Sequence, residues 1–274
     1  MRTKTGAKAM TICVVIGSRA DQALLEWPIS CLQKEEAFDI IVSHLPHITF
    51  TAHPDLILLL GDRFEILGAA LCAHLRRLPI AHIAGGDITE GSYDDAMRDC
   101  ISRLATLHFT TSPQSTARLR SMGYRHVHEI GNLAVDAIQQ GDWKRERPIP
   151  EPYVVVSYQA ETIDDTVDLS AVEAAINGRK AIWIKPNPDR GNERIPATEE
   201  FTHADFLNLL YYCEEFIGNS SSMFYEAPYL GVKCKIIGKR QKGRVIPPVD
   251  GHATERMIAV LKTYAAEQRC VSSA

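Results

Sequence analysis

Carboxylates gather in one short stretch of this sequence. Residues 82–99, HIAGGDITEGSYDDAMRD, contain Asp87, Glu90, Asp94 and Asp95 ahead of a fifth acidic residue. The stretch opens on an apolar run typical of a buried parallel strand, so these side chains are expected at a strand end. Crowded carboxylates raise one another's pKa, which gives a site an acid and a base near neutral pH. The stretch predicts proton transfer or binding of sugar hydroxyls, although capping of a helix start equally explains Asp94 and Asp95.

A further candidate acid follows another apolar run. LILLLGDRFE delivers Asp62 and Glu65 from a second predicted strand end. Neighbouring parallel strands end at the same edge of a sheet, so Asp62 is expected to join the carboxylates of the first stretch. Such a set would also attract Mg²⁺, but sugar hydroxyls and proton transfer explain it equally well, and the histidines and cysteines separately lack a zinc-type spacing. We expect a carboxylate site without a metal.

An anion site is predicted in FIGNSSSMFYEAPYLG, residues 216–231. A strand gives way to Asn219, Ser220 and Ser221 and then to a helix, so free amides and hydroxyls converge on one spot suited to phosphate or diphosphate. A serine helix cap without a ligand is the alternative. Glu226, further along the helix, is placed to accept hydrogen bonds from ribose hydroxyls or merely to face solvent. Phosphate and ribose together indicate a nucleotide.

Cations follow two other predicted strands. VVIGSRAD offers Arg19, and IIGKRQKGR offers Arg240 and Arg244 with two lysines. One guanidinium group can donate two parallel hydrogen bonds to the oxygens of a phosphate. These arginines are therefore suited to binding a diphosphate leaving group. A solvated loop is the alternative for both segments. The sequence has no G-x-G-x-x-G, so a nicotinamide or flavin cofactor is unsupported.

Strand-like and helix-like segments alternate along the chain, which predicts an α/β fold of two Rossmann-like, doubly wound domains facing a cleft. Expected strands are 11–16, 39–43, 56–60, 80–83, 107–111, 126–129, 153–157, 181–185, 215–217 and 233–237. Expected helices are 21–34, 64–76, 93–105, 113–122, 164–177, 203–212, 221–230 and 252–267. We expect a disordered leader at 1–10, domains at 11–142 and 153–251, a Pro-rich linker at 143–152, and a final helix and tail at 252–274 that crosses back.

The composition is that of an ordinary globular protein. The net charge of −4 gives no global attraction to nucleic acid. Seven cysteines without a C-x-x-C pair indicate reduced thiols. No run is long enough for a membrane span, and the first residues lack a secretory signal. We expect a cytoplasmic protein without membrane association.

The motifs resemble, in order and spacing, the UDP-N-acetylglucosamine 2-epimerases, particularly the hydrolysing branch of sialic-acid and related sugar biosynthesis. The resemblance covers most of the chain after Met10. The motifs that carry it are IGSRAD, LILLLGDRFE, AHIAGGDITEGSYDDAMRDCISRLATLHFTTS, IGNLAVDAI, PNPDRGNERI, IGNSSSMFYEAPYLG and IGKRQKGR.

The resemblance implies the two-domain architecture shared with many nucleotide-sugar glycosyltransferases, known as GT-B, and a UDP-sugar substrate with no cofactor. It implies abstraction of the C2 proton, expulsion of UDP to a 2-acetamidoglucal, and addition of water. The diphosphate ligands would be Arg19, Ser220, Ser221, Arg240 and Arg244, beside Asn219, with Glu226 on the ribose. The sugar would lie among Asp62, Asp87, Glu90, Asp94 and Asp95.

Three departures separate the chain from the resembling family. Gln159, in VVVSYQAET, stands where the family has a catalytic histidine, so an acid-base role there is lost. Ala84 replaces a glutamate found in some members. The region before PDLILLLGD lacks the longer insert of typical members, which leaves the sugar more open.

Two other function classes stay open at this point. An open sugar site without the histidine would suit a UDP-sugar-dependent glycosyltransferase acting on a glycan, a small molecule or a hydroxymethylated DNA base. RLRSMGYRH and WKRERP would then supply phosphate contacts to DNA, although a solvated surface is the simpler interpretation. A nucleotide-sugar-binding protein without catalysis is the third class. A homodimer is expected by resemblance alone.

Overall fold

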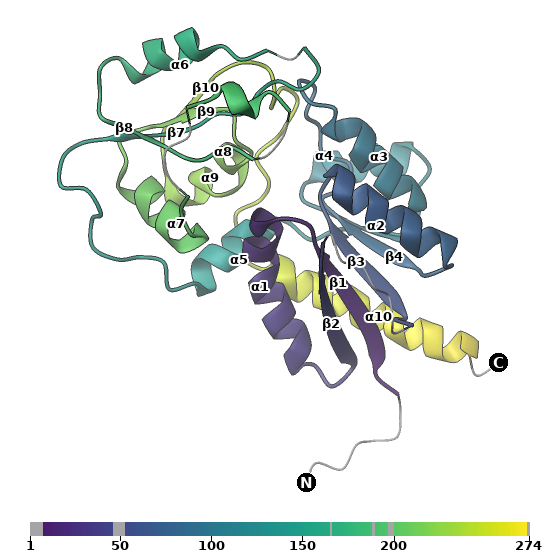
Figure 1. Cartoon of the computed structure of the whole chain (residues 1–274). Coiled ribbons are helices and arrows are strands. Elements are labelled where there is room, and N and C mark those ends of the chain that lie inside the picture. The colour runs from purple at the N-terminus through teal and green to yellow at the C-terminus, as the bar shows by residue number, and fades with distance from the viewer. Residues whose placement is uncertain (1–7, 46–52, 165, 188–189, 197–199, 273–274) are drawn as a thin grey trace. The chain divides into compact units, whose positions relative to one another are not determined.

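The computed structural model describes residues 8–45, 53–164, 166–187, 190–196 and 200–272 (Figure 1). They form two compact units. Unit 1 takes its residues from 1–86, 97–133 and 251–274, and unit 2 from 87–96 and 134–250. Residues 1–7 of the expected leader, and Pro188 and Asp189 of the PNPDRGNERI motif, lie outside the described residues.

Unit 1 is built on a six-stranded parallel sheet of order β2-β1-β3-β4-β5-β6. The four inner strands of the sheet are buried along almost their whole length, as the interior of a parallel sheet requires, whereas the two edge strands, β2 and β6, are partly exposed. The order reverses between β1 and β3, which is the switch point of a doubly wound sheet. The strands are β1 Met10–Ile16, β2 Phe38–His44, β3 Leu56–Leu60, β4 Ile80–Ile83, β5 Leu107–Thr110 and β6 Val127–Glu129.

Helices cover both faces of this sheet (Figure 1). Alternate residues of β1 point to opposite faces: Ile12 and Val14 pack with α1 Arg19–Lys34 and α10 Ala253–Ser272, whereas Cys13 and Val15 pack with α2 Phe64–Leu75 and α3 Asp94–Leu104. α4 Pro113–Ser121 completes the helices of the unit. The chain thus returns to unit 1 for its last helix.

The first helix is held by a reciprocal cap directly after β1. Ser18 Oγ accepts a hydrogen bond from the amide of Asp21, and the Asp21 carboxylate accepts from the amides of Gly17 and Ser18 at 3.1 and 2.9 Å. This is the capping-box arrangement, and it fixes the strand-to-helix turn that carries Arg19.

Unit 2 repeats the same plan with a four-stranded parallel sheet of order β10-β9-β7-β8. The order again reverses at the first strand of the sheet, between β7 and β9. The strands are β7 Val154–Ser157, β8 Ala181–Trp183, β9 Phe216–Gly218 and β10 Cys234–Ile236. The helices are α5 Leu133–Gln140, α6 Leu169–Ile176, η1 Asn192–Arg194, α7 His203–Tyr212, α8 Ser222–Tyr225 and α9 Ala227–Leu230.

The expected α/β class with two Rossmann-like, doubly wound halves is confirmed, and all expected strands are present within a few residues. The helix expected at 221–230 is wrong as a single helix, since α8 and α9 meet at Glu226. Pro228 has no amide proton to bond the carbonyl four residues earlier, so the helical ladder is interrupted. α5 was not expected.

The units also divide the chain at different places from the sequence-based boundaries. Residues 87–96 and 134–142 pack in unit 2 rather than with the first sheet. Trp143, expected to open a linker, is buried beside Leu207 of α7, and its Nε1 donates to the carbonyl of Ile138 at 2.7 Å. Packing of this tryptophan attaches the Pro-rich segment to unit 2.

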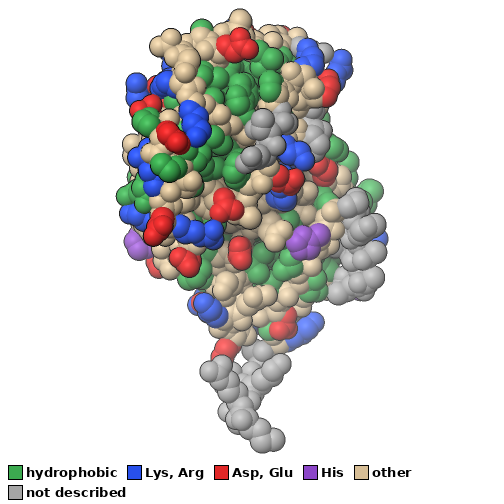
Figure 2. Space-filling model, turned by 60° about the vertical axis from the view of Figure 1, so that its left-hand side comes forward, with side chains coloured by type: hydrophobic (Ala, Val, Ile, Leu, Met, Phe, Trp, Pro, Cys, Tyr) green, Lys and Arg blue, Asp and Glu red, His purple; other side chains and the backbone are tan. Residues whose placement is uncertain are grey.

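Charged side chains of both signs are interspersed over the face of the molecule drawn in Figure 2, with no large patch of one sign. No helix in the part of the chain that the structure describes is long and apolar enough to cross a membrane.

Acidification is expected to destabilise unit 1 through His108. This side chain is buried in β5 against the ring of Tyr124, and burial lowers its pKa from 6.5 to about 4. The unfolded chain takes up this proton near pH 6.5, whereas the folded chain takes it up only near pH 4. The free energy of unfolding therefore falls by about 3 kcal/mol as the pH drops from 6.5 to about 4.

The measurement is urea unfolding of wild type and His108→Phe from pH 7.5 to 4. The difference between the two proteins isolates this group, because Asp21, whose pKa burial raises to about 6, changes stability in the opposite sense in both. An exposed-histidine variant, His252→Phe, is the control. An equal pH dependence in all three proteins would contradict the assignment.

Candidate functional site

The loops after β7 and β9 meet at the switch point of unit 2, where ligands bind in open α/β sheets. Ser157 and Gly218 are register partners at the ends of these strands. Gly218 has φ +135°, and a Cβ there would collide with the carbonyl of Ser157. Glycine is therefore required for the two loops to leave the sheet side by side.

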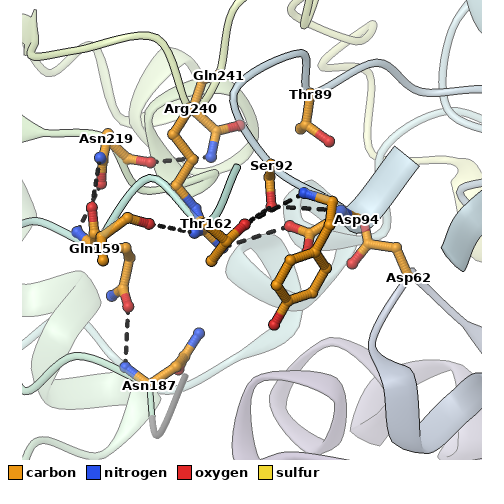
Figure 3. Close-up of polar contacts among 12 residues, drawn as sticks. Asp62, Thr89, Ser92, Asp94, Gln159, Thr162, Asn187, Asn219, Arg240 and Gln241 are labelled. Carbon is orange, nitrogen blue, oxygen red and sulfur yellow. Dashed lines mark hydrogen bonds and ion pairs between the residues drawn. The ribbon is translucent and has the colours of Figure 1, made fainter. Parts of the chain in front are cut away.

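Asn219 fixes the β7 loop from the β9 side. Its side chain bonds both backbone groups of Gln159: Oδ1 accepts from the amide at 2.7 Å, and Nδ2 donates to the carbonyl at 2.8 Å. Gln241 in turn donates to the carbonyl of Asn219 at 2.9 Å. Figure 3 shows the contact between Asn219 and Gln159. Asn219 is fully buried, so its structural role is to rigidify the loop.

The side chain of Gln159 is held by a second asparagine pair. Its Oε1 accepts from Asn192 Nδ2 at 2.7 Å. It also accepts from the amide of Asn187 at 3.1 Å, a contact drawn in Figure 3. Asn192 also accepts from the amide of Ala160 at 2.7 Å. Residue 159 is thus anchored by its backbone and its side chain, while its Nε2 has no hydrogen-bond partner among the described residues.

Arg240 ties the acidic stretch to this loop. Its Nη1 donates to the carbonyl of Ala160 at 2.8 Å, and its Nη2 lies 3.4 Å from a carboxylate oxygen of Asp94. A Cβ on Gly91 would lie 2.5 Å from the amide nitrogen of Arg240, so the two backbones are in direct contact. This close approach is why residues 87–96 belong to unit 2.

Each carboxylate of the acidic stretch in unit 2 has its own partner. Asp87 accepts a hydrogen bond from the hydroxyl of Tyr225, Glu90 pairs with Lys242 at 2.6 Å, and Asp95 accepts from the amide and hydroxyl of Thr89 at 2.8 and 2.6 Å. With Asp94 on Arg240, the set is dispersed over separate donors. Each of these carboxylates thus has at least one hydrogen-bond donor or cation beside it in unit 2, and their mutual crowding stays a prediction of the sequence.

Unit 1 holds three of the predicted residues, Asp62, Glu65 and Arg19. Asp62, directly after β3, forms an ion pair with Arg98, whose side chain is 1% exposed. Glu65 pairs with Arg63 at 3.0 Å. Arg19 is exposed at the first position of α1, after the Ser18 cap.

The predicted anion site is formed by the amides and hydroxyls of the loop after β9, because the helix that follows is short. α8 spans four residues, so its macrodipole is small. The amides of Ser220 and Ser221 donate no hydrogen bond within the described chain, and Ser220 Oγ accepts only the amide of Ser222, at 3.3 Å. Two amides and two hydroxyls therefore remain as donors to an anion.

Arg244, unlike Arg240, forms no ion pair with a carboxylate of the described residues. Its guanidinium stacks over the ring of Tyr225 at 5.2 Å from the centroid, and it makes no hydrogen bond within the described part of the chain. Arg240, by contrast, is bound to Ala160 and Asp94. Arg244 is the better candidate to neutralise a diphosphate.

Sequence reasoning missed Asn187, Asn192, Tyr225 and His203. Asn187 and Asn192 lie within PNPDRGNERI, and Tyr225 lies within IGNSSSMFYEAPYLG. These motifs pointed to the right segments of the chain but did not show what the three side chains contact. His203, at the start of α7, lies in none of the motifs. No group of three or more acidic, histidine or cysteine side chains among the described residues is placed to hold a metal ion.

Comparison with known proteins identifies the family of this chain. The sequence profile of the family described as UDP-N-acetylglucosamine 2-epimerase matches residues 32–262. Polysialic acid biosynthesis protein P7 of Escherichia coli is 30% identical over 70% of this chain and 56% of its own length. GDP/UDP-N,N'-diacetylbacillosamine 2-epimerase (hydrolyzing) of Campylobacter jejuni is 26% identical over 70% of this chain and 58% of its own length. The chain thus spans less than two thirds of these relatives.

Solved structures share the fold. The Staphylococcus aureus MnaA–UDP structure superposes with a TM-score of 0.76 at 16% identity, covering 93% of this chain and 97% of that one. The Neisseria meningitidis UDP-GlcNAc 2-epimerase bound to UDP-GlcNAc gives 0.73 at 16% identity, covering 92% and 99%. On the extent of the profile match, the chain belongs to the UDP-N-acetylglucosamine 2-epimerase family.

Proposed function

We propose that this protein is a hydrolysing UDP-HexNAc 2-epimerase that releases UDP. The observation that carries the proposal is the convergence, at the switch point of unit 2, of the free donors of Ser220 and Ser221 with the anchored Gln159 loop and its carboxylate, Asp94. Solved relatives are described as complexes with UDP or UDP-GlcNAc, which supports a nucleotide sugar as substrate.

The proposed reaction needs a base and stabilisation of a leaving diphosphate. A carboxylate removes the C2 proton, the electron pair forms a C1–C2 double bond, and the C1–O bond breaks as UDP departs with its electrons. Water then adds hydroxyl to C1 and a proton to the opposite face of C2. The products are N-acetylmannosamine and UDP.

Asp94 is the proposed base of unit 2. Its side chain is 21% exposed, and its partner Arg240 lies at 3.4 Å, a longer contact than those of Glu90 and Asp95. It therefore combines access with proximity to the Gln159 loop. Ser220, Ser221 and Arg244 are the proposed diphosphate donors in unit 2, and Arg19 and Asp62 of unit 1 remain predicted contributors.

Turnover without an acceptor is the direct test. UDP-GlcNAc incubated with the protein in D₂O is expected to give UDP and N-acetylmannosamine that carries deuterium at C2, measured by NMR. Asp94→Asn is expected to slow this by about 10²-fold to 10⁴-fold. Asp99→Asn, an acid of the same stretch paired with Arg118 at 2.8 Å, is the matched control. Release of UDP only after an acceptor is added would identify a transferase, and binding without turnover a noncatalytic protein.

The remaining expectations stay predictions of the sequence. These are independence from a divalent metal, a cytoplasmic location and a homodimer. α2 offers a surface for a second copy, because Phe64, Leu71 and Leu75 are 55%, 48% and 81% exposed at helical spacing.

A further inference from the structure

The loop after β7, residues 158–162, holds the backbone on the N-terminal side of Asp94, the proposed base. Thr162 Oγ1 accepts a hydrogen bond from the amide of Tyr93 at 3.2 Å. The same hydroxyl lies 3.1 Å from Ser92 Oγ, which in turn accepts from the amide of Asp94 at 3.4 Å. All four residues belong to unit 2, and Figure 3 draws these contacts. Two hydroxyl groups therefore bind two consecutive amides.

These two amides lie at the start of a helix, where amides need partners from outside the helix. Asp94 is the first residue of α3, and the first four amides of a helix have no carbonyl one turn earlier to bond. A hydroxyl donates one hydrogen bond and accepts two, so the pair binds both amides whichever hydroxyl donates to the other. A side chain from a distant segment thus sets the turn that carries Asp94.

The same loop also fixes the carboxylate of Asp94, through Arg240. Arg240 Nη2 lies 3.4 Å from Asp94 Oδ2, and Arg240 Nη1 donates to the carbonyl of Ala160, two residues before Thr162, at 2.8 Å. The buried side chain of Asn219 bonds the backbone of this loop on both sides of a peptide unit. An anchored loop therefore reaches Asp94 by two routes, one to its backbone and one to its side chain (Figure 3).

Loss of the Thr162 hydroxyl would move the carboxylate of Asp94 without changing its charge or removing its cation. The amide of Tyr93 would lose its acceptor, and the turn would be held at Asp94 chiefly by the longer contact to Arg240. A base must lie within hydrogen-bond reach of the proton that it removes, and a displacement of about 1 Å can slow a reaction about 10²-fold. The donors of Ser220 and Ser221 would stay in place, because they follow a different strand.

We propose that Thr162 is a positioning residue that sets the carboxylate of Asp94 for removal of the C2 proton. Its hydroxyl acts through the turn at Ser92 and Tyr93 and not through contact with the substrate. The inference rests on the proposed function, because it requires Asp94 to be the base.

Turnover of UDP-GlcNAc and calorimetric binding of UDP, measured separately, test this role. Thr162→Val keeps the shape of the side chain and removes its hydroxyl. The kcat for acceptor-independent UDP release is expected to fall about tenfold to 10²-fold, with the Kd for UDP within about twofold of wild type. Thr162→Ser keeps the hydroxyl and is expected to recover most of the loss. Thr166→Val is the control, because this threonine is exposed and its hydroxyl donates to the carbonyl of Asp164 at 3.4 Å.

A double variant shows whether the hydroxyl acts through the base. Asp94→Asn alone is expected to be slow, and adding Thr162→Val is expected to slow it no further, because the group that Thr162 positions has gone. A residue that contributed to catalysis independently of Asp94 would instead lower the rate by the same factor in both backgrounds.

The outcomes separate the two proposals. Absence of acceptor-independent turnover in wild type overturns the proposed function, and the role of Thr162 with it. With an active wild type, the role of Thr162 alone is overturned by an unchanged kcat in Thr162→Val, by equal losses in Thr162→Val and Thr162→Ser, by a Kd for UDP that weakens in step with kcat, or by an undiminished effect in the Asp94→Asn background. A thermal melt identifies any variant that does not fold. Ser92→Ala, which removes the other hydroxyl of the pair, then replaces Thr162→Val under the same expectations.

Discussion

Replacing Arg98 by alanine is expected to lower the free energy of unfolding of unit 1 by about 3–5 kcal/mol. The Arg98 side chain is 1% exposed, and its guanidinium forms an ion pair with Asp62 at the end of β3. Removing it leaves the carboxylate beside a cavity with its counter-charge gone. The loss exceeds that of an ordinary surface pair because both desolvation and packing are affected.

Urea unfolding measures this loss, and a second pair in unit 1 provides the control. Arg118 and Asp99 pair at 2.8 Å with side chains 27% and 33% exposed, so Arg118→Ala should cost no more than about 1 kcal/mol. The double variant Asp62→Asn with Arg98→Met should recover part of the Arg98→Ala loss, since the unpaired charge is gone. Equal losses for Arg98→Ala and Arg118→Ala would show that the buried pair is not the source.

Gln159→His is expected to raise acceptor-independent release of UDP by about 10²-fold or more. A glutamine amide cannot titrate, whereas an imidazole exchanges protons near neutral pH. The substitution should leave the loop in place, because the backbone groups of residue 159 are held by Asn219 and the amide of Ala160 by Asn192. Histidine can still accept from Asn192 through one ring nitrogen, which leaves the other for proton transfer.

Steady-state turnover of UDP-GlcNAc as a function of pH checks this prediction. The increase in turnover of the Gln159→His variant should depend on pH, because the new imidazole titrates. A merely structural change would not produce this pH dependence. Gln241→His is the matched control: Gln241 is buried in the same network but donates to Asn219 from the other side. A rate that is unchanged, or that rises equally in both variants, would show that Gln159 does not limit the reaction.

Local residue patterns were enough to predict the strands, most helices and the α/β class. Apolar β-branched runs such as VVVS and LILLL stop at glycine or polar residues, and their alternation with helical periodicity leaves few arrangements other than two parallel sheets. It also located Asn219, Ser220 and Ser221 at a strand end, because that placement depends only on local chain order. These features are short in range, so periodicity reveals them.

Contacts between groups far apart in the chain were visible only in the folded structure. It placed residues 87–96 in unit 2, where the backbone of Gly91 contacts that of Arg240, and it set a donor from a distant segment beside Asp87 and Asp94. It interrupted the helix at Glu226 and set His203 beside it. Such pairings depend on packing between segments far apart in the chain, and no local pattern of residues encodes the partner of a given side chain.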